Sequence, residues 1–521
     1  MLDRILTVGG LTLVSRISGF ARDMVLAYVL GAGPVADAFI VALRLPNHFR
    51  AIFAEGAFNA AFVPAYARIR QQQGDASVRA FGDRIFTLMV ITQAVLLVLA
   101  LLFMPWVVAA LAPGFTEDPT RFTLAVEFTR ITFPYLMLMA LVTLYSGILN
   151  ARERFAAAAA APILLNLTMI AALALAWLFP SAGQAAAWGV LIAGFLELAL
   201  VSGDAARVGA AARFRWPRWD ADIKRFFWAL GPATVGSSGV QLALLADTMI
   251  ASFLAQGAVS ALYYADRLNQ LPIGVIGIAA GTVVLPEMAR RIAAGDESGA
   301  LHAQNRAIEL TLLLSVPCVA AFLLVPDLIM RALFARGAFT AGDAAAAAAT
   351  LAAYTVGLIP FVLIRSVTAT FLARGDTWTP VKAALLAAVV NIAFKVALMG
   401  PLAQVGLALA TAIGAWINFG LVVWFAASAG LFRLDERLKA SAVKIAVAGL
   451  GLALVLWLAQ GPVLNLFGPP LRDVAALAAL AVIGGIVYGC LIVALFGRHW
   501  LAAFGRRRDR KVNATGTDHD C

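Results

Sequence analysis

Charged residues and cysteine are scarce in this chain of 521 residues. Asp, Glu, Lys and Arg make up only 13% of the chain, whereas 62% of it is hydrophobic. The mean hydropathy of +0.88 excludes a water-soluble protein and predicts a polytopic membrane protein. The three cysteines, Cys318, Cys490 and Cys521, are irregularly spaced, which excludes a disulfide framework. Four histidines without paired spacing argue equally against a metal centre.

Motifs of enzymes are missing too. The sequence contains no Walker loop, no G-x-S-x-G elbow and no H-E-x-x-H pair. We therefore expect that the chain is not an enzyme and does not consume ATP. Its first residues do not form a clear signal peptide, because Arg16 interrupts the apolar run and no cleavage site follows. We expect this segment to stay as part of the first helix.

Apolar stretches long enough to cross a bilayer, of about 20 residues each, follow one another along the chain. They lie near residues 8–30, 36–64, 84–111, 127–149, 160–180, 185–203, 226–255, 259–289, 307–334, 345–372, 381–400, 404–428, 441–460 and 473–497. Every second gap between them carries Arg or Lys, and the gaps in between are nearly bare. This alternation predicts about 14 transmembrane helices, with both termini in the cytoplasm.

An internal repeat divides this all-α chain. LGAGPVADAFIVALRLPN at 30–47 resembles LAQGAVSALYYADRLNQLP at 254–272, and AFVPAYARI at 61–69 resembles VVLPEMARR at 283–291. The common offset predicts two pseudo-symmetric six-helix bundles related by an axis along the membrane normal. The predicted domains are bundles at 1–204 and 226–428, a basic cytoplasmic loop at 205–225, two additional helices at 441–497 and a cytoplasmic tail at 498–521.

The first two apolar stretches hold most of the intramembrane charge. These ionisable residues are Arg16, Arg22, Asp23, Asp37, Arg44, Arg50 and Glu55. One charge at the bilayer centre costs roughly 3 kcal/mol, so this set facing lipid would cost on the order of 20 kcal/mol. The charges therefore predict a polar, mostly cationic cavity that binds an anion. Salt bridges that only pin helices together are the alternative, and Arg50 and Glu55 could instead reach the interface.

The second half supplies further charges within apolar stretches. They are Asp247, Asp266, Arg267, Arg365 and Lys395. The repeat aligns Arg267 with Arg44 to within one residue. Arginines from both halves suit a phosphate or pyrophosphate, because the guanidinium fork can bind two oxygens at once. Asp247 and Lys395 lie at similar depth and form a candidate ion pair.

Five segments together resemble one known family. They are GFARD at 19–23, ADAFIVALRLPN at 36–47, FAEGAFNAAFVP at 53–64, YYADRLNQLP at 263–272 and ARGDTWTPV at 373–381. They resemble the MurJ (MviN) lipid II flippases of the multidrug/oligosaccharidyl-lipid/polysaccharide exporter superfamily. The resemblance implies alternating access and transport of lipid II, an undecaprenyl-pyrophosphate-linked peptidoglycan precursor, from the inner to the outer leaflet. It also implies that the two additional helices form a groove for the polyprenyl tail.

The resemblance implies specific substrate-binding residues as well. These are Arg16, Arg22, Asp23, Asp37, Arg50, Glu55, Asp266, Arg267 and Arg365. Arg22, Arg267 and Arg365 would contact the pyrophosphate or nearby groups, and Asp23 would orient Arg22. Which arginine contacts the pyrophosphate directly stays open.

Coupling is implied by the same resemblance. Some members have a sodium-coupled design, and here Asp247 and Asn391 offer oxygen ligands. Lys395 stands where a second carboxylate would help, so we expect coupling to the membrane potential rather than to sodium, with a proton or another monovalent cation as the alternative, and no metal or other cofactor.

The expected partners are lipid II, membrane lipids and cell-wall synthases, with no nucleic acid, and the expected state is a monomer. Two alternatives remain within the superfamily, an exporter of another lipid-linked saccharide and a drug/cation antiporter. The arginine excess disfavours a cationic drug. A non-transporting scaffold would not need a buried charged cavity.

Overall fold

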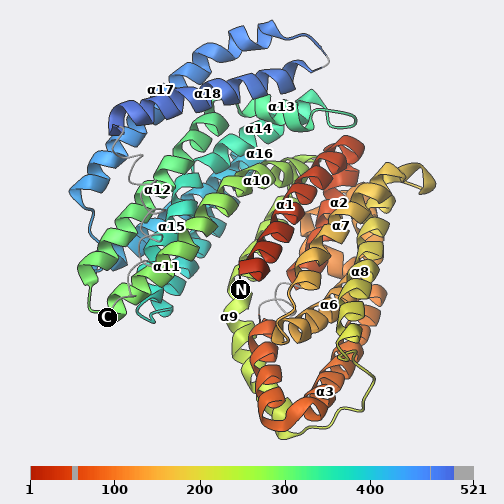
Figure 1. The fold of residues 1–521 in the computed structure, drawn as a ribbon. Helices are drawn as coiled ribbons and strands as arrows, with labels where there is room; N and C mark the ends of the chain where they lie inside the picture. Colours follow the sequence, from red (N-terminus) through yellow and green to blue (C-terminus); the bar gives the residue numbers. More distant parts are fainter. Residues whose placement is uncertain (1, 50–56, 470, 498–521) are drawn as a thin grey trace, which may run out of the picture. The chain divides into compact units, whose positions relative to one another are not determined.

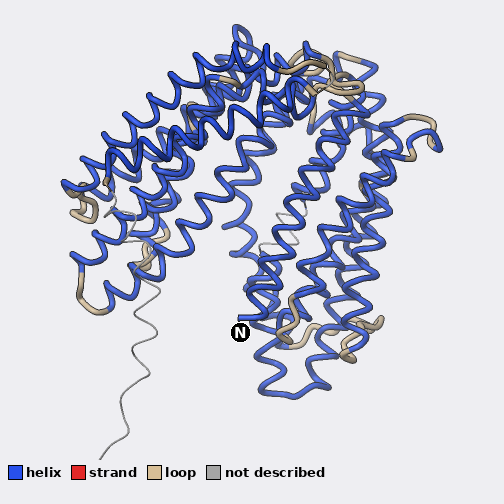
Figure 2. The backbone as a smooth tube through the Cα atoms, turned by 45° about the horizontal axis from the view of Figure 1, so that its top comes forward, coloured by secondary structure: helices blue, strands red, loops and turns tan. Residues whose placement is uncertain are grey.

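The computed structural model describes residues 2–49, 57–469 and 471–497, which are nearly all helical (Figures 1 and 2). No strand occurs within these residues, so the prediction of an all-α fold is confirmed. Contacts divide the chain into two compact units. Unit 1 comprises Met1–Tyr264, Phe334–Ala346 and Lys395–Gln404; unit 2 comprises Ala265–Leu333, Ala347–Phe394 and Val405–Cys521. The predicted domain boundaries come from the repeat and stay a prediction.

Unit 1 is built mainly from the first nine α-helices. They are α1 (Leu2–Leu30), α2 (Pro34–Phe49), α3 (Ala57–Leu102), α4 (Met104–Leu111), α5 (Pro119–Thr132), α6 (Pro134–Ala151), α7 (Ala156–Ala174), α8 (Ala182–Arg207) and α9 (Ala221–Ser252), with the short helices η2 (Pro113–Glu117) and η3 (Ala176–Leu178). Helix α7 packs against α8 and α1, α2 packs against α5, and α3 packs against α6 and α9. The helix α10 (Ala258–Pro272) begins in unit 1 and ends in unit 2.

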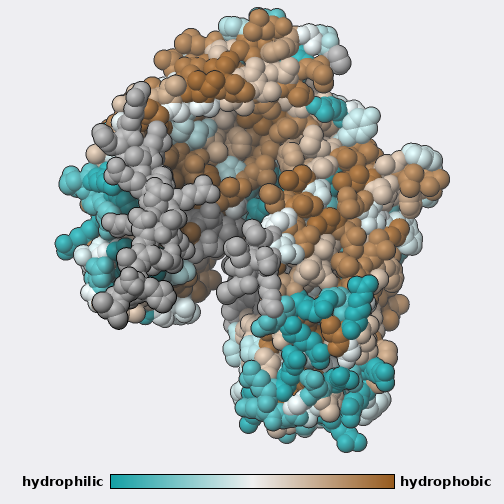
Figure 3. Space-filling model, viewed as in Figure 1, coloured by the Kyte–Doolittle hydropathy of each residue, from teal (hydrophilic) through white to brown (hydrophobic). Residues whose placement is uncertain are grey.

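Unit 2 contains the remaining helices. They are η4 (Ile273–Gly277), α11 (Ile278–Ala293), α12 (Glu297–Leu324), α13 (Pro326–Phe334), α14 (Ala341–Thr355), α15 (Leu358–Leu372), α16 (Trp378–Ser428), α17 (Glu436–Leu466) and α18 (Arg472–Phe496). Short pieces of α13, α14 and α16 belong to unit 1. Helix α12 packs against α11, α15 and α17, and α17 packs against α18. The outer surfaces of α17 and α18 are hydrophobic, as a membrane-facing surface must be (Figure 3).

Nine helical stretches of the described residues are long and apolar enough to cross a membrane. Helices α1, α2, α9 and α10 are not among them, and α1 and α2 carry the charges that the sequence singles out. The predicted count of 14 therefore stays a prediction. The predicted stretch near 36–64 also includes residues 50–56, which lie outside the described residues.

Two helices are too long to be single spans. Helix α3 has 46 residues and α16 has 51, against the roughly 20 that a bilayer needs. Backbone angles leave the helical region at Gly74, where φ is 80°, and at Ala403, where φ is 47°. At Gly74 the chain folds back. The contact between Phe62 and Phe81 shows this, since their rings stack across the bend with centroids 5.8 Å apart. Helix α16 likewise includes the two predicted stretches at 381–400 and 404–428.

Candidate functional site

The residues predicted to bind substrate fall in both units, and each unit is described by itself. In unit 1, Arg22 and Asp23 of α1 form a buried ion pair, with 8% and 2% of their surface exposed. Arg22 Nε and Nη2 donate to Asp23 Oδ1 at 3.1 and 2.7 Å. Arg22 Nη1 donates to Asn166 Oδ1 of α7 at 3.0 Å. The hydroxyl of Tyr263 in α10 donates to Asp23 Oδ1 at 2.9 Å. We call these four residues the Arg22 cluster.

Asn166 is fixed in the orientation that the Arg22 cluster needs. Its Nδ2 donates to the carbonyl of Ser15 and to Ser18 Oγ, both at 3.0 Å, so its Oδ1 faces Arg22. Gly19 permits this close approach, because a Cβ there would lie only 3.4 Å from Asn166 Nδ2. Asn166 was not predicted from the sequence. The available signal was one amide in an otherwise apolar stretch of α7.

The Arg22 cluster holds its guanidinium out of water. A buried arginine is tolerable only when a carboxylate and further hydrogen bonds replace its hydration. Asp23 supplies the charge and Asn166 supplies a neutral acceptor. The planar fork is therefore desolvated and oriented before any ligand arrives, which is the arrangement that anion recognition requires.

Asp37 lies in a second buried site of unit 1, at the start of α10. It is fully buried, and it accepts hydrogen bonds from Gly257 N at 2.7 Å, Ser260 N at 2.9 Å and Ser260 Oγ at 2.6 Å. The carboxylate thus caps the N-terminus of α10, where amide donors and the helix dipole favour a negative charge. Arg121 Nη1 lies 3.9 Å from Asp37 Oδ2. These contacts position α10, and the predicted contact of Asp37 with substrate stays a prediction.

Arg121 ties this second site to the loop before α5. Its Nε donates to Asp118 Oδ2 at 2.8 Å and its Nη1 donates to the carbonyl of Leu254 at 2.8 Å. A hydrogen bond from Gln256, with further ones from Arg121, lowers the pKa of Asp118 below its usual range. Asp118 therefore stays ionised and caps α5, where it accepts from the backbone amides of Thr120 and Arg121.

The other predicted residues of unit 1 are less enclosed. Arg16 is exposed on α1, and Arg44 is half-buried on α2. Arg50 and Glu55 lie outside the described residues. The structure therefore brings Arg22 and Asp23 together in unit 1, places Asp37 separately at α10, and does not place Arg16 in either cluster.

In unit 2, Arg365 of α15 lines a cavity of about 440 Å³ together with residues of α11 and α15. Gly277 and Gly281 lie against the Arg365 side chain, since a Cβ at either position would be in van der Waals contact with it, at 3.4 and 3.6 Å. Among the described residues that line this cavity, Arg365 alone is charged. A cavity with one arginine and otherwise mainly apolar walls suits an amphiphile with an anionic group.

Asp266 and Arg267 follow one another in the part of α10 that belongs to unit 2. Both are half-buried. Gln270, one turn later, donates to both oxygens of Asp266 at 3.3 and 3.4 Å. Their predicted role in substrate binding stays a prediction.

The expected pairing of Asp247 with Lys395 is present in unit 1. The Lys395 ammonium, on a residue only 2% exposed, donates to the Asp247 carboxylate of α9. Asn391 stands one turn before Lys395 on α16 and is half-buried. No group of three or more His, Cys, Asp or Glu that could hold a metal ion occurs among the residues that the structure describes.

Comparisons with known proteins give a consistent result. The family model described as "Lipid II flippase MurJ" matches residues 26–470. A probable lipid II flippase MurJ of Rhizobium meliloti is 40% identical over 516 residues, covering 97% of this chain and 94% of the relative. The lipid II flippase MurJ of Burkholderia cenocepacia is 34% identical, covering 96% of this chain and 97% of the relative.

Solved structures agree on the fold. A lipid II flippase MurJ in an inward closed conformation gives a TM-score of 0.80 at 23% identity, covering 95% of this chain and 99% of that one. An inward-facing multidrug transporter of the MATE family gives a TM-score of 0.64 at 15% identity, covering 84% of this chain and 95% of that one. From the extent of the family match and the identity to its relatives, the chain belongs to the MurJ family of lipid II flippases, which are transporters and not enzymes.

Proposed function

We propose that this protein moves lipid II from the inner to the outer leaflet of the bacterial cytoplasmic membrane, for peptidoglycan synthesis. Family membership supports the substrate, and the Arg22 cluster is the observation that carries the mechanism. A pyrophosphate is multiply charged and must exchange strong hydration for fixed donors inside the membrane. A guanidinium that Asp23 and Asn166 already orient binds such a group with little further ordering cost.

Alternating access requires that the anion be bound and then released. Arg22 has protein acceptors of its own, so Asp23 and Asn166 can take back its donors when the pyrophosphate leaves. The charge of the guanidinium is then compensated both with and without bound pyrophosphate. This lowers the free-energy cost of the state without substrate. Arg365, in the cavity between α11 and α15 of unit 2, is the proposed second arginine, and Arg267 is the third.

The lipid tail calls for an apolar surface. We assign it to the paired helices α17 and α18, whose outward side chains include the exposed Leu450, Trp457 and Ile486. In this proposal the pyrophosphate headgroup stays in the polar cavity while the isoprenoid chain lies against these apolar side chains. The chain thereby remains in contact with lipid.

Transport is proposed to draw on the membrane potential rather than on sodium. The Lys395 ammonium already neutralises Asp247, so a sodium ion has no free carboxylate to bind there. The protein is proposed to act as a monomer beside cell-wall synthases, with both termini in the cytoplasm. The basic residues of unit 1 favour that orientation, because positively charged loops remain on the cytoplasmic side.

The test is complementation of a bacterial strain depleted of its own lipid II flippase. The wild-type chain is expected to restore growth, Arg22→Ala to abolish it, and Arg22→Lys to restore it weakly because a point charge lacks the guanidinium fork. Asn166→Ala should give growth between that of the wild type and that of Arg22→Ala, since it removes one anchor of the guanidinium. The matched control is Arg290→Ala, which removes a 75% exposed arginine side chain of α11.

Two results would contradict the proposal. Full growth with Arg22→Ala at normal expression would remove Arg22 from the site. Failure of the wild-type chain, when it is correctly inserted, would favour an exporter of another lipid-linked saccharide.

A further inference from the structure

A segment that runs from the end of α8 into the first turns of α9 alternates cations with exposed aromatic rings. It comprises residues 208–228, and we call it the basic aromatic segment. Its cationic residues are Arg213, Arg215, Arg218, Lys224 and Arg225, and all are exposed. Phe214 and Trp219 are exposed as well, and Trp216 and Trp228 are 83% and 82% exposed. Large aromatic side chains in contact with water need an explanation, since burying them would be favourable.

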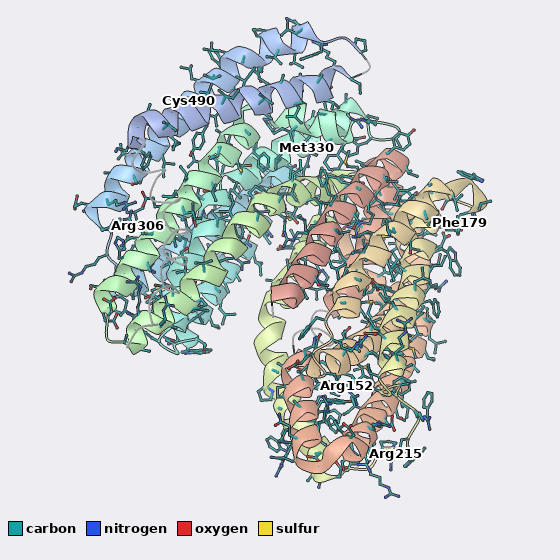
Figure 4. All side chains as sticks on the ribbon, in the orientation of Figure 1. Arg152, Phe179, Arg215, Arg306, Met330 and Cys490 are labelled. Atoms are coloured by element: carbon teal, nitrogen blue, oxygen red, sulfur yellow. The ribbon has the colours of Figure 1, made fainter. Side chains whose placement is uncertain are left out.

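The backbone of this segment is fixed against unit 1. Arg213 N donates to Asp83 Oδ1 at 2.9 Å, and Arg215 N donates to Thr87 Oγ1 at 2.9 Å. The ring of Phe214 packs on that of Phe86 with centroids 5.3 Å apart. Two backbone amides and one ring therefore hold the segment on α3. Its arginine side chains play no part in this attachment, and Figure 4 shows Arg215 at the same end of unit 1 as Arg152.

The acidic residues of the segment are already neutralised. Asp220 pairs with Arg84, and Asp222 accepts from Arg68 Nη2 at 3.1 Å. Both arginines belong to α3 and lie outside the segment. Among the described residues, none of the five cationic side chains of the segment has a hydrogen bond or an ion pair. The attachment to α3 thus leaves an uncompensated positive surface.

The position of the segment identifies what this surface meets. It follows α8, whose 26 residues form an apolar candidate span that ends at Arg207, and it includes the first residues of α9, which begins at Ala221. The ends of such spans lie at the level of the lipid headgroups, where tryptophan is favoured and cations attract anionic lipids. The hydrophilic surface at this end of unit 1 fits that depth (Figure 3).

We propose that the basic aromatic segment is a binding surface for anionic phospholipid headgroups. The arginines contact the headgroup phosphates, and Trp216, Trp219 and Trp228 insert among the headgroups. A nucleic acid or an acidic protein would also pair with the arginines. Neither would offer the tryptophans the membrane–water interface at which this side chain is favoured. The surface depends neither on the Arg22 cluster nor on lipid II.

The test places an environment-sensitive fluorophore in the full-length protein. Cys318, Cys490 and Cys521 are changed to serine, and Ala211→Cys, within the segment and next to its first arginines, carries the probe. The protein is reconstituted in vesicles of phosphatidylcholine alone or mixed with phosphatidylglycerol. We expect a blue shift of the emission in the phosphatidylglycerol vesicles that high salt reverses, because salt screens the attraction.

Two triple variants separate the segment from overall charge. The combined change Arg213→Gln, Arg215→Gln and Arg218→Gln should abolish the blue shift. The matched change Arg70→Gln, Arg290→Gln and Arg433→Gln removes the same charge from exposed side chains outside the segment and should preserve the shift. Equal emission in both kinds of vesicle, or an undiminished shift in the first variant, would overturn the proposal. The salt experiment uses the unaltered arginines and decides the question even if a variant fails to fold. The assay contains no lipid II, so its result is independent of the transport proposal.

Discussion

The buried charged side chains that the structure describes have specific partners. Asp23 is paired with Arg22, and Lys395 with Asp247. The same holds for two carboxylates to which the sequence assigned no role. Glu197 of α8, 1% exposed, accepts from the hydroxyl of Tyr135, and Glu309 of α12 pairs with Arg306. Pairing is the physical condition for charge within a membrane span, because an unpaired charge would have to be neutralised or hydrated.

Lys395→Ala is predicted to destabilise the protein by about 2–3 kcal/mol. Removing one member of a buried ion pair usually costs about 3–5 kcal/mol, and the partial exposure of Asp247 reduces that loss. The double variant Lys395→Met, Asp247→Leu should recover most of the stability, because it leaves no unpaired charge. Thermal unfolding in detergent measures both effects.

The same measurement tests the coupling proposal. Wild-type protein should unfold at the same temperature in NaCl and in KCl at equal ionic strength. A specific stabilisation of the wild type by sodium would show that Lys395 does not exclude the ion from Asp247.

At the scale of helices, ends and bends are set by local chemistry. Asp118 caps α5, Ser181 caps α8 and Asp435 caps α17 by accepting from backbone amides at their N-termini. Pro134 begins α6 directly after α5, where its missing N–H costs nothing. The sequence predicted one stretch near 127–149, and the structure has two helices, α5 and α6, divided at this proline. Hydropathy does not locate such a break, because hydrophobic side chains continue across it, with Ile131 and Phe133 before the proline and Leu136 after it.

Gly114→Ala is predicted to destabilise the junction between η2 and the end of α9. A Cβ at this position would lie 2.4 Å from the backbone nitrogen of Phe253 and 2.5 Å from its Cα. Backbone atoms cannot move aside as a flexible side chain can, and Gly114 N also donates to Ser252 Oγ at 2.9 Å. We expect a loss of about 1–3 kcal/mol, measured as a lower unfolding temperature.

Gly203→Ala is the matched control. No heavy atom would lie within 4 Å of its Cβ, and the residue is inside α8. This change should stabilise the helix by about 0.5–1 kcal/mol, since alanine loses less backbone entropy than glycine. Equal effects of Gly114→Ala and Gly203→Ala on the unfolding temperature would mean that the contact of residue 114 with Phe253 is not close.

At the scale of the whole molecule, the distribution of charge decides the orientation in the membrane. Arg68, Arg84, Arg154 and the basic aromatic segment belong to connected parts of unit 1, held together by ion pairs such as Arg154 with Asp204. Figure 3 shows that end of the unit as hydrophilic and the middle as hydrophobic. Such a surface is typical of a protein whose basic end stays in the cytoplasm.

The predicted orientation can be measured with reporters. Green fluorescent protein fused after the last residue should fluoresce, and alkaline phosphatase at the same place should be inactive. A reporter inserted at Ser181, before α8, should give the opposite pair of results. Active phosphatase at the C-terminus would contradict a cytoplasmic tail.

Much of this protein follows from its sequence alone. The scarcity of charge determined that it spans a membrane, because lipid admits apolar helices of a length set by the bilayer. The charges at Arg22 and Asp23 marked the polar region, since their burial must be compensated, and the repeat pointed to corresponding charges in the second half. Hydropathy placed some helices within a few residues of their bounds, among them α8, α9 and α18.

Only the tertiary structure decided which groups compensate those charges. Asn166 lies 144 positions from Arg22, and Tyr263 lies 240 positions from Asp23. The cap that Asp37 places on α10 likewise joins residues 220 and 223 positions apart. Hydropathy and spacing show which residues of one helix share a face and whether that face is polar or apolar. A hydrogen bond depends on position and direction between helices, and packing fixes these only when the whole chain has folded.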